Sequence, residues 1–359
     1  MNKKILMMPG PVQVSDEIME CFSEPQIPHR SLEFSKILKE CYEDLKYVFQ
    51  TENDVYILSS SGTGAMCSAL ENLINPGDKV LCLVNGVFSN RFYDIAISKG
   101  AVVHKIEVEK GCAIFAEKLE RVMAKESYKL VTLAHCETST GVANDIRTLC
   151  KIIKKYGAIS VVDGISSIGA MECKMDEWGI DVLISASQKG LMVPAGLSFI
   201  SVSNRAYEIY KQCQNPSYYF DWRKYKVAIQ NNTVPFTPAI NQIFALHKSL
   251  EIIRREGLDN IISRRKNYCY KLRNGLKGLG MKLLPENDNF VANSLCALYC
   301  PEKYTSTQII DYIQDNYGIV IANGQLELKD KILRIGTLGN INEKDIDKLL
   351  YALKKLLKK

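Results

Sequence analysis

A lysine in the middle of the chain follows an apolar run, at a point where the backbone can bend. The run covers residues 180–184, small residues come after it, and Lys189 then precedes a Pro-Ala-Gly turn at 194–196. Most lysines are solvated, because burial of the charge is costly unless it is paired or its pKa falls. The alternative is an amine held against an aldehyde cofactor as a Schiff base. A second group is needed to decide between the two interpretations.

An aspartate ends another apolar run about one βα unit upstream. Residues 159–162 are β-branched or small and lead directly into Asp163, as a buried parallel strand that ends in a carboxylate would. A pyridoxal ring works as an electron sink while its nitrogen is protonated, and an ionised carboxylate beside that nitrogen keeps it so. Asp163 alone is as often a helix cap. The pairing of Asp163 with Lys189 at two strand ends is more specific and favours a pyridoxal phosphate site.

A small-residue turn upstream has the composition of an anion site. Residues 55–58 form an apolar run, residues 59–64 are mostly serine and glycine, and a helix is predicted from 65 to 74. The free backbone N–H groups and the positive dipole end of such a helix suit a phosphate. A plain turn is the commoner cause of a Ser/Gly cluster, and the GxxxxGK[ST] pattern of a P-loop is absent. A phosphate site and an ordinary turn both stay open here.

Two other side chains have a structural and a functional interpretation. Phe88 follows an apolar run at 80–84 and either packs in the core or lies on an aromatic ring. Arg334 stands inside an apolar run at 332–335 and either points to solvent or binds a carboxylate with two parallel hydrogen bonds. The residues alone favour core packing for Phe88 and solvent exposure for Arg334.

Alternating strands and helices would position these groups. Alternation of this length predicts a mostly parallel sheet with helices on both faces and ligands at the carboxyl ends of the strands. The small-residue turn, Thr138, Asp163 and Lys189 all follow predicted strands, so one rim of the sheet would gather them. The expected strands are 55–58, 80–84, 101–108, 130–135, 159–163 and 180–184, and the expected helices are 16–22, 32–49, 65–74, 89–99 and 146–156.

The length of the chain indicates more than one domain. Its 359 residues exceed the ~250 to 300 at which single hydrophobic cores stop growing. Pro9 and Pro11 exclude a helix at the start, which predicts an extended arm. A helix at 239–256 would link the domains, and a final helix at 343–357 has one apolar side. We expect an arm at 1–15, a large domain at 16–255, and a small domain at 256–359 with strands near 291–299, 319–322 and 332–335.

Composition excludes several classes of protein. The net charge of +6 comes from 46 basic and 40 acidic residues spread along the chain, so no nucleic-acid partner is expected. Twelve cysteines without a CxxC pair and four histidines show no metal-site spacing and indicate reduced thiols in the cytoplasm. Pro9 ends an apolar start that is too short for a signal peptide, and no ~18-residue apolar run predicts a membrane helix.

Several segments, in the same order along the chain, resemble the class V aminotransferases of the alanine/serine:glyoxylate type. The resemblance covers nearly the whole sequence. It implies a fold type I pyridoxal-phosphate-dependent transferase, an α/β protein whose large domain has a mostly parallel central sheet sandwiched by helices, with a smaller C-terminal α/β domain. It also implies pyridoxal 5'-phosphate as cofactor and a homodimer with each active site at the interface. The segments are Gly10-Pro11, His29-Arg30-Ser31, 61–64, 85–86, 135–142, 163–167 and 187–190.

The resemblance also implies which residues surround the cofactor. Lys189 would bond the cofactor aldehyde and later shuttle a proton, and Asp163 would pair with the pyridine nitrogen. Phe88 would stack on the ring, and Thr138 would lie beside its polar edge. The phosphate would be held by Thr63, Gly64 and Gln188, and by Thr233 of the partner subunit.

For the substrate, the resemblance points to the N-terminal arm and to the C-terminal domain. Arg334 would bind the α-carboxylate, and Gly10 would also contact the substrate. Some relatives carry a tyrosine three positions before Thr233, where this chain has Gln230. What replaces that phosphate contact stays open.

The implied activity is transfer of an amino group from a small amino acid, of alanine or serine type, to glyoxylate or pyruvate with ping-pong kinetics. A 2-aminoethylphosphonate:pyruvate transaminase is an alternative, although asparagine is common there in place of Gln188. A cysteine desulfurase would carry a histidine before the lysine and a late catalytic cysteine, but residues 301–359 contain none. A non-catalytic scaffold should have lost Lys189, Asp163 or Arg334, and all three are present. The sequence does not determine the donor or the acceptor.

Overall fold

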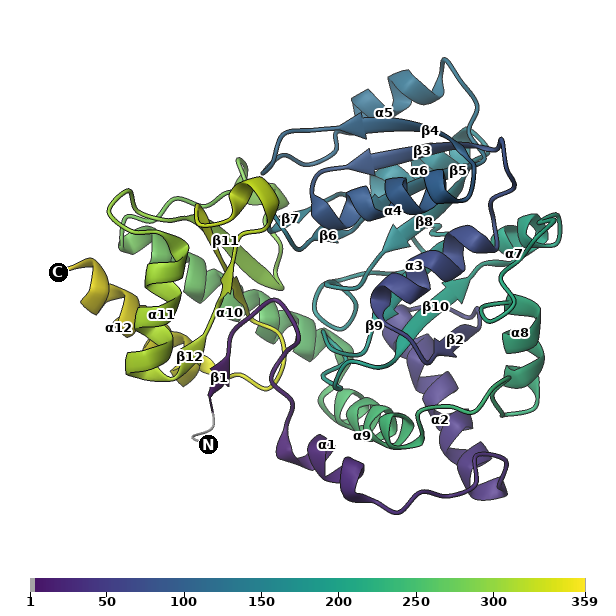
Figure 1. The fold of residues 1–359 in the computed structure, drawn as a ribbon, viewed down its shortest axis with the longest axis horizontal. Coiled ribbons are helices and arrows are strands. Elements are labelled where there is room, and N and C mark those ends of the chain that lie inside the picture. The colour runs from purple at the N-terminus through teal and green to yellow at the C-terminus, as the bar shows by residue number, and fades with distance from the viewer. Residues whose placement is uncertain (1–3, 359) are drawn as a thin grey trace.

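The computed structural model describes residues 4–358 and contains one large sheet. Its strands run in the order β2-β10-β9-β8-β5-β3-β4, with helices on both sides of the sheet (Figure 1). All neighbours are parallel except those of β10, which is antiparallel to β2 and to β9. The mostly parallel sheet is therefore confirmed. Its strands are β2 (Val55–Leu58), β3 (Lys79–Val84), β4 (Val102–Glu107), β5 (Leu130–Ala134), β8 (Ile159–Asp163), β9 (Val182–Ala186) and β10 (Ser198–Val202).

Two features of the sheet beside the lysine differ from expectation. Strand β10 is not among the expected strands; it reverses the chain after the lysine loop and pairs along the whole of β9. The expected strand at 180–184 is shifted, because β9 begins at Val182 and ends at Ala186. Asp181 lies just before the strand, and its carboxylate accepts from the N–H of Ser160 on β8 at 3.0 Å.

Alternate side chains of the sheet enter two separate hydrophobic cores. In β3, Leu81 and Leu83 lie in one core, and Val80, Cys82 and Val84 lie in the other. This period of two is that of a strand buried on both faces. The first core is covered by α2 (Leu32–Phe49), α5 (Ala116–Met123), α6 (Ile146–Lys155) and α9 (Ile240–Glu256), and the second by α3 (Gly62–Glu71), α4 (Val87–Ser98), α7 (Asn204–Tyr210) and α8 (Trp222–Gln230).

The helix after the small-residue turn begins earlier than expected. Its expected start is residue 65, whereas α3 begins at Gly62. Ser61 is the N-cap, and its hydroxyl accepts from the N–H of Gly64 at 3.4 Å. Serine at this position satisfies an N–H that has no partner within the helix. Thr63 and Gly64 therefore lie in the first turn of the helix and not in a loop before it.

The C-terminal third forms a smaller sheet with its own core. In this sheet β11 (Leu295–Tyr299) and β13 (Ala322–Asn323) are antiparallel to β14 (Ile332–Gly336). The core draws residues from 268 to 356 and also Met7 of the arm. The domain boundaries at 1–15, 16–255 and 256–359 stay a prediction, with which the separate cores agree. The helices that pack here are α10 (Leu258–Gly278), α11 (Ser306–Tyr317) and α12 (Glu343–Leu357).

The N-terminal arm runs between the two sheets. Its strand β1 (Ile5–Leu6) pairs in parallel with β12 (Ile319–Val320), and the two lie side by side in Figure 1. The carbonyl of Met7 accepts from the N–H of Gly336 at 2.8 Å, and the N–H of Val12 donates to the carbonyl of Gln188 at 3.2 Å. The arm therefore connects the C-terminal sheet to the lysine loop.

Short elements complete the described chain. No helix among residues 4–358 is long and apolar enough to cross a bilayer. All twelve cysteines are free thiols. The remaining elements are α1 (Asp16–Glu20), β6 (Cys136–Glu137), β7 (Val142–Ala143) and three 3-10 helices, η1 (Cys21–Ser23), η2 (Asp288–Phe290) and η3 (Leu326–Leu328).

Candidate active site

Lys189 is buried against the arm. The residue is 9% exposed, and its Nζ donates to the carbonyl of Pro9 at 2.9 Å. A Cβ on Gly10 would lie 2.5 Å from the same nitrogen, so only glycine lets the arm approach so closely. Burial lowers the pKa of Lys189 to about 8, with Arg334 adding to the decrease and Cys136 and Asp163 opposing it. The interpretation of Lys189 as a solvated lysine is therefore wrong.

Asp163 lies at the end of the strand next to that of the lysine. It is the last residue of β8 and pairs in register with Ile184 of β9. One carboxylate oxygen accepts from the N–H of Ile165 at 2.8 Å. Burial raises the pKa of Asp163 to about 7, while Lys189 and Arg91 act in the opposite direction. The carboxylate is thus coupled to the buried amine and caps no helix.

Arg334 is buried as well, which corrects the solvent-exposed interpretation. It is 8% exposed, and its Nε donates to the carbonyl of Asn323 at 2.8 Å. Its Nη1 donates to the carbonyl of Thr138 at 3.3 Å. Among residues 4–358 it forms no ion pair with a carboxylate. The hydroxyls of Thr138 and Ser166 lie 2.6 Å apart, so the loops after β5 and β8 meet beside this guanidinium.

Phe88 is held at the start of α4 by a carboxylate that the sequence analysis misses. Phe88 is the second residue of α4 and is half-buried. The fully buried Glu137 accepts from the N–H of Phe88 at 3.2 Å and from the N–H of Ser89 at 2.8 Å. A carboxylate at a helix N-terminus accepts from N–H groups that have no partner within the helix, and its negative charge interacts favourably with the positive end of the helix dipole. An acidic residue in the hydroxyl-rich segment after β5 is the sequence signal that points to this contact.

The small-residue turn and the residue before the lysine carry free polar groups. Thr63 is half-buried in the first turn of α3, and its hydroxyl accepts from Nη1 of Arg91 at 2.8 Å. A Cβ on Gly64 would lie 2.6 Å from the hydroxyl of Ser60. The side-chain oxygen of Gln188 is buried and has no hydrogen-bond partner in the described chain. The Thr63 hydroxyl and the N–H groups of the first turn of α3 can donate to a phosphate ester. The unpaired oxygen of Gln188 is an acceptor, so this residue would have to donate through its amide NH2 group.

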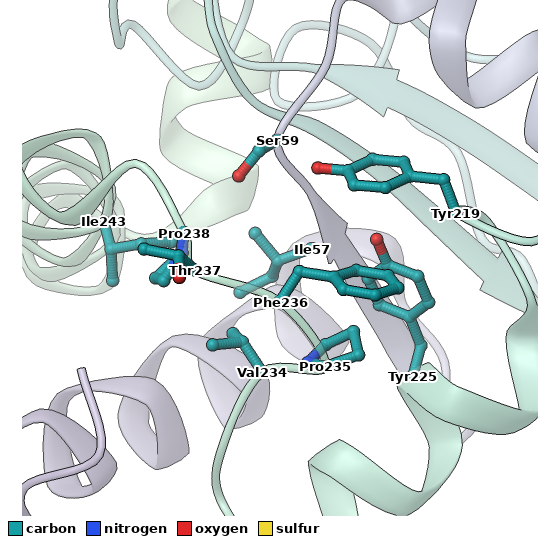
Figure 2. A pocket seen from close by; sticks show the side chains of 10 residues that line it. All are labelled: Ile57, Ser59, Tyr219, Tyr225, Val234, Pro235, Phe236, Thr237, Pro238 and Ile243. Carbon is teal, nitrogen blue, oxygen red and sulfur yellow. The ribbon is translucent and has the colours of Figure 1, made fainter.

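Thr233 stands apart from the other predicted residues. Among residues 4–358 it makes no hydrogen bond to any of them, and its carbonyl accepts from the hydroxyl of Tyr42 at 2.9 Å. Gln230 is the exposed last residue of α8. The segment after Thr233 passes the end of β2 and borders the small pocket in Figure 2, which Ser59 and Tyr219 also line. Lys189 and Asp163 do not line this pocket.

Comparison with known proteins decides the family. The sequence profile described as Aminotransferase class-V matches residues 11–349. The chain belongs to the class V aminotransferase family. With a buried amine, a buried carboxylate on the neighbouring strand and a Ser/Gly turn at a helix N-terminus, this class V aminotransferase has a site that fits its cofactor, pyridoxal phosphate.

Relatives of this aminotransferase match it over most of their length. It is 37% identical to the soluble hydrogenase 42 kDa subunit of Anabaena cylindrica, over 99% of this chain and 94% of that protein. It is 33% identical to the serine–glyoxylate aminotransferase of Methylorubrum extorquens, over 94% of this chain and 87% of that protein. The crystal structure of alanine–glyoxylate aminotransferase from Nostoc sp. superposes with a TM-score of 0.95 at 28% identity, covering 99% and 96% of the two chains. The type I fold is thereby confirmed.

Proposed function

We propose that this aminotransferase moves the amino group of a small amino acid, of alanine or serine type, to glyoxylate or pyruvate. The observation that carries the proposal is the buried guanidinium of Arg334, which has no carboxylate partner among residues 4–358 and whose charge acts on the Lys189 amine. A buried cation of this kind is stabilised by an anionic ligand. The close packing of Gly10 against Lys189 leaves little room between the arm and the amine, which favours a small donor. The relatives that act on serine or alanine and glyoxylate agree with this choice.

The roles of the residues follow from their positions. Pyridoxal phosphate, when bound, supplies an electron-poor ring that takes up the electron pair left on the α-carbon of the substrate. The amine of Lys189, with a pKa of about 8, moves the proton from that carbon. Asp163 would hold the proton at the ring nitrogen, and a cation there would lower the pKa of this carboxyl from its buried value of about 7.

The remaining predicted residues would bind and orient. Arg334 would bind the substrate carboxylate through donors that the carbonyls of Asn323 and Thr138 leave free. Gly10 would border the substrate from the arm. The other cofactor contacts are proposed for Thr63, Gly64 and Gln188 at the phosphate, Phe88 on the ring face, and Thr138 at the ring edge.

A donor and acceptor panel tests the proposed activity. Alanine, serine, aspartate and 2-aminoethylphosphonate would be paired with glyoxylate, pyruvate and 2-oxoglutarate, and kcat/KM measured for each pair. We expect alanine or serine with glyoxylate or pyruvate to be best. Preference for aspartate or 2-aminoethylphosphonate would overturn the proposed substrate class. Lys189→Ala should abolish turnover and the absorption band formed with pyridoxal phosphate, whereas Lys344→Ala, at an exposed lysine of α12, should change neither.

We further propose a homodimer in which Thr233 reaches the phosphate site of the other subunit. An exposed aromatic surface supports this, because Tyr218 is 78% exposed and the rings of Tyr219 and Phe236 stack with centroids 4.9 Å apart. The surface borders the phosphate turn, since a Cβ on Gly64 would lie 3.5 Å from Cζ of Phe220. Exposed aromatic groups of this kind are enriched at interfaces between proteins.

Subunit mixing tests the shared site. A hybrid of Lys189→Ala and Thr233→Val subunits would contain one site with both residues intact. The mixture of the two variants should therefore have a higher activity, per chain that carries Lys189, than the Thr233→Val protein by itself. A mixture without this gain, or sedimentation as a monomer at assay concentrations, would contradict the proposed arrangement.

A cytoplasmic location is also proposed. It is supported by the twelve cysteines, all of them free thiols, because disulfides form and persist mainly in oxidising compartments.

A further inference from the structure

Arg91 contacts two of the predicted cofactor residues at once. It lies on α4 one turn after Phe88 and is half-buried. Its Nη1 donates to the hydroxyl of Thr63 at 2.8 Å, which joins α4 to the first turn of α3. Its guanidinium carbon lies 5.0 Å from the centroid of the Phe88 ring. One side chain thus touches both the proposed phosphate donor and the proposed ring-stacking residue.

The charge of Arg91 is not balanced by a neighbouring carboxylate. Among residues 4–358 it forms no ion pair, whereas Asp94 on the same helix accepts from the side chain of Asn90 at 3.2 Å. The guanidinium of a half-buried arginine that forms no ion pair keeps donors with which to bind an anion. Its field acts into the site, since Arg91 is one of the groups that lower the pKa of Asp163. A doubly charged phosphate at the start of α3 would supply the missing anion.

The bond to Thr63 also determines what its hydroxyl can do. The hydroxyl oxygen already accepts from Arg91, so its own hydrogen is free to be donated elsewhere. A cation that binds the oxygen polarises the O–H group and makes it a stronger donor. The free N–H groups of the first turn of α3 favour an anion at the same place.

We propose that Arg91 is a positioning residue of the cofactor site, which directs the Thr63 hydroxyl to the phosphate and makes the site selective for a phosphorylated cofactor. The inference rests on the proposed placement of pyridoxal phosphate. Selectivity follows because the charge and the oriented hydroxyl act on the phosphate, which pyridoxal lacks. A purely structural Arg91 would affect both ligands equally.

The test is titration of the cofactor-free protein with pyridoxal phosphate and with pyridoxal, followed by absorbance. Arg91→Gln should raise the Kd for pyridoxal phosphate about tenfold to a hundredfold, the range expected for loss of a charged hydrogen-bonding group, and change the Kd for pyridoxal less than about threefold. Arg91→Lys, which keeps the charge, should recover part of the loss. Inorganic phosphate should raise the Tm of the wild type more than that of Arg91→Gln.

Lys105→Gln is the matched control. Its Nζ lies 2.9 Å from the side-chain oxygen of Asn90 and 4.1 Å from the centroid of the Tyr93 ring, so it makes the same two kinds of contact to α4 from the edge strand β4. This variant should bind both ligands as the wild type does. Equal losses of affinity for both ligands, or unchanged affinity for pyridoxal phosphate in Arg91→Gln and Arg91→Lys, would overturn the proposed role of Arg91. Neither result would overturn the proposed function. A wild-type protein that binds neither ligand would overturn the proposed function and this inference together.

Discussion

A Cβ on Gly10 would lie 2.5 Å from Nζ of Lys189, 2.7 Å from its Cε and 2.8 Å from its Cδ. The whole end of the lysine side chain therefore lies against the backbone of the arm. The carbonyl of Pro9 accepts a hydrogen bond from the same amine. The arm is thus one wall of the site, and its conformation bears directly on where the amine is held.

Gly10→Ala should lower kcat about tenfold to a hundredfold, because displacement of a reacting group by an ångström costs up to about that much. The absorption band formed with pyridoxal phosphate should weaken as well. Gly77→Ala is the control, since Gly77 also has a positive φ, +86°, but a Cβ there would meet no atom within 4 Å. Equal effects of the two substitutions would show that contact with Lys189 is irrelevant.

The rate at which pyridoxal phosphate combines with the cofactor-free protein should depend on the state of Lys189. Only the neutral amine attacks an aldehyde, and burial lowers the pKa of this amine to about 8 from an ordinary 10.5. The association rate should therefore rise with pH and level off above about 8. Stopped-flow absorbance would measure it, and a rate that climbs steadily to pH 10 would contradict the lowered pKa.

Asp163→Asn should stabilise the cofactor-free protein at pH 8 while reducing transamination. The folded-state pKa of about 7 lies above the ordinary 3.8, so the wild type loses stability as pH rises between these values. Asparagine retains an oxygen that can accept from the N–H of Ile165, and because it does not ionise, the variant does not lose stability in this pH range. Because a pKa difference of one corresponds to about 1.4 kcal/mol, we expect a gain of roughly 2 to 4 kcal/mol.

Urea unfolding at pH 4 and pH 8 would measure this difference. The advantage of the variant should shrink toward pH 4, where the carboxyl is protonated in the folded protein. Turnover should fall at both pH values, because asparagine cannot hold a cationic ring nitrogen by charge. A variant less stable than the wild type at pH 8 would show that ionised Asp163 stabilises the fold.

Arg334→Lys should raise the KM for the amino donor about tenfold to a hundredfold and leave the Kd for pyridoxal phosphate unchanged. Lysine keeps the charge but loses the planar fork that binds a carboxylate with two parallel bonds. Steady-state kinetics with a varied donor separates the two quantities. Arg147→Lys, at an arginine of α6 whose side chain is 68% exposed, should change neither the donor KM nor the Kd for pyridoxal phosphate. An unchanged donor KM would remove Arg334 from carboxylate binding.

Local signals were sufficient for the parallel strands of the large sheet and for the helices with regular apolar faces. The bounds of α2 at Leu32–Phe49 and of α12 at Glu343–Leu357 are those expected, because each has a regular apolar face and a capping residue, Ser31 and Asn342. The strand ends at Asp163 and at the lysine loop were also recognisable, since apolar runs there stop at chemically distinctive side chains.

Features that depend on packing between elements were not predictable from one sequence. The strand β10 is short and joins the sheet only because the lysine loop turns back on β9. The burial of Arg334 depends on the loop that carries Thr138, nearly two hundred residues earlier. Arg91 contacts Thr63 of the neighbouring helix α3, and periodicity carries no information on such a contact.

The arm that borders the lysine has a consequence for synthesis of the protein. The carbonyl of Met7 bonds to Gly336, and that of Gln13 accepts from the N–H of Asn340 at 2.7 Å, so the arm is fixed by residues that are translated more than 300 positions later. The large sheet has all its strands once translation passes Val202. The wall formed by Pro9 and Gly10 can be fixed only after β14 has been translated, so a nascent chain stalled before β14 would carry the lysine without its enclosure.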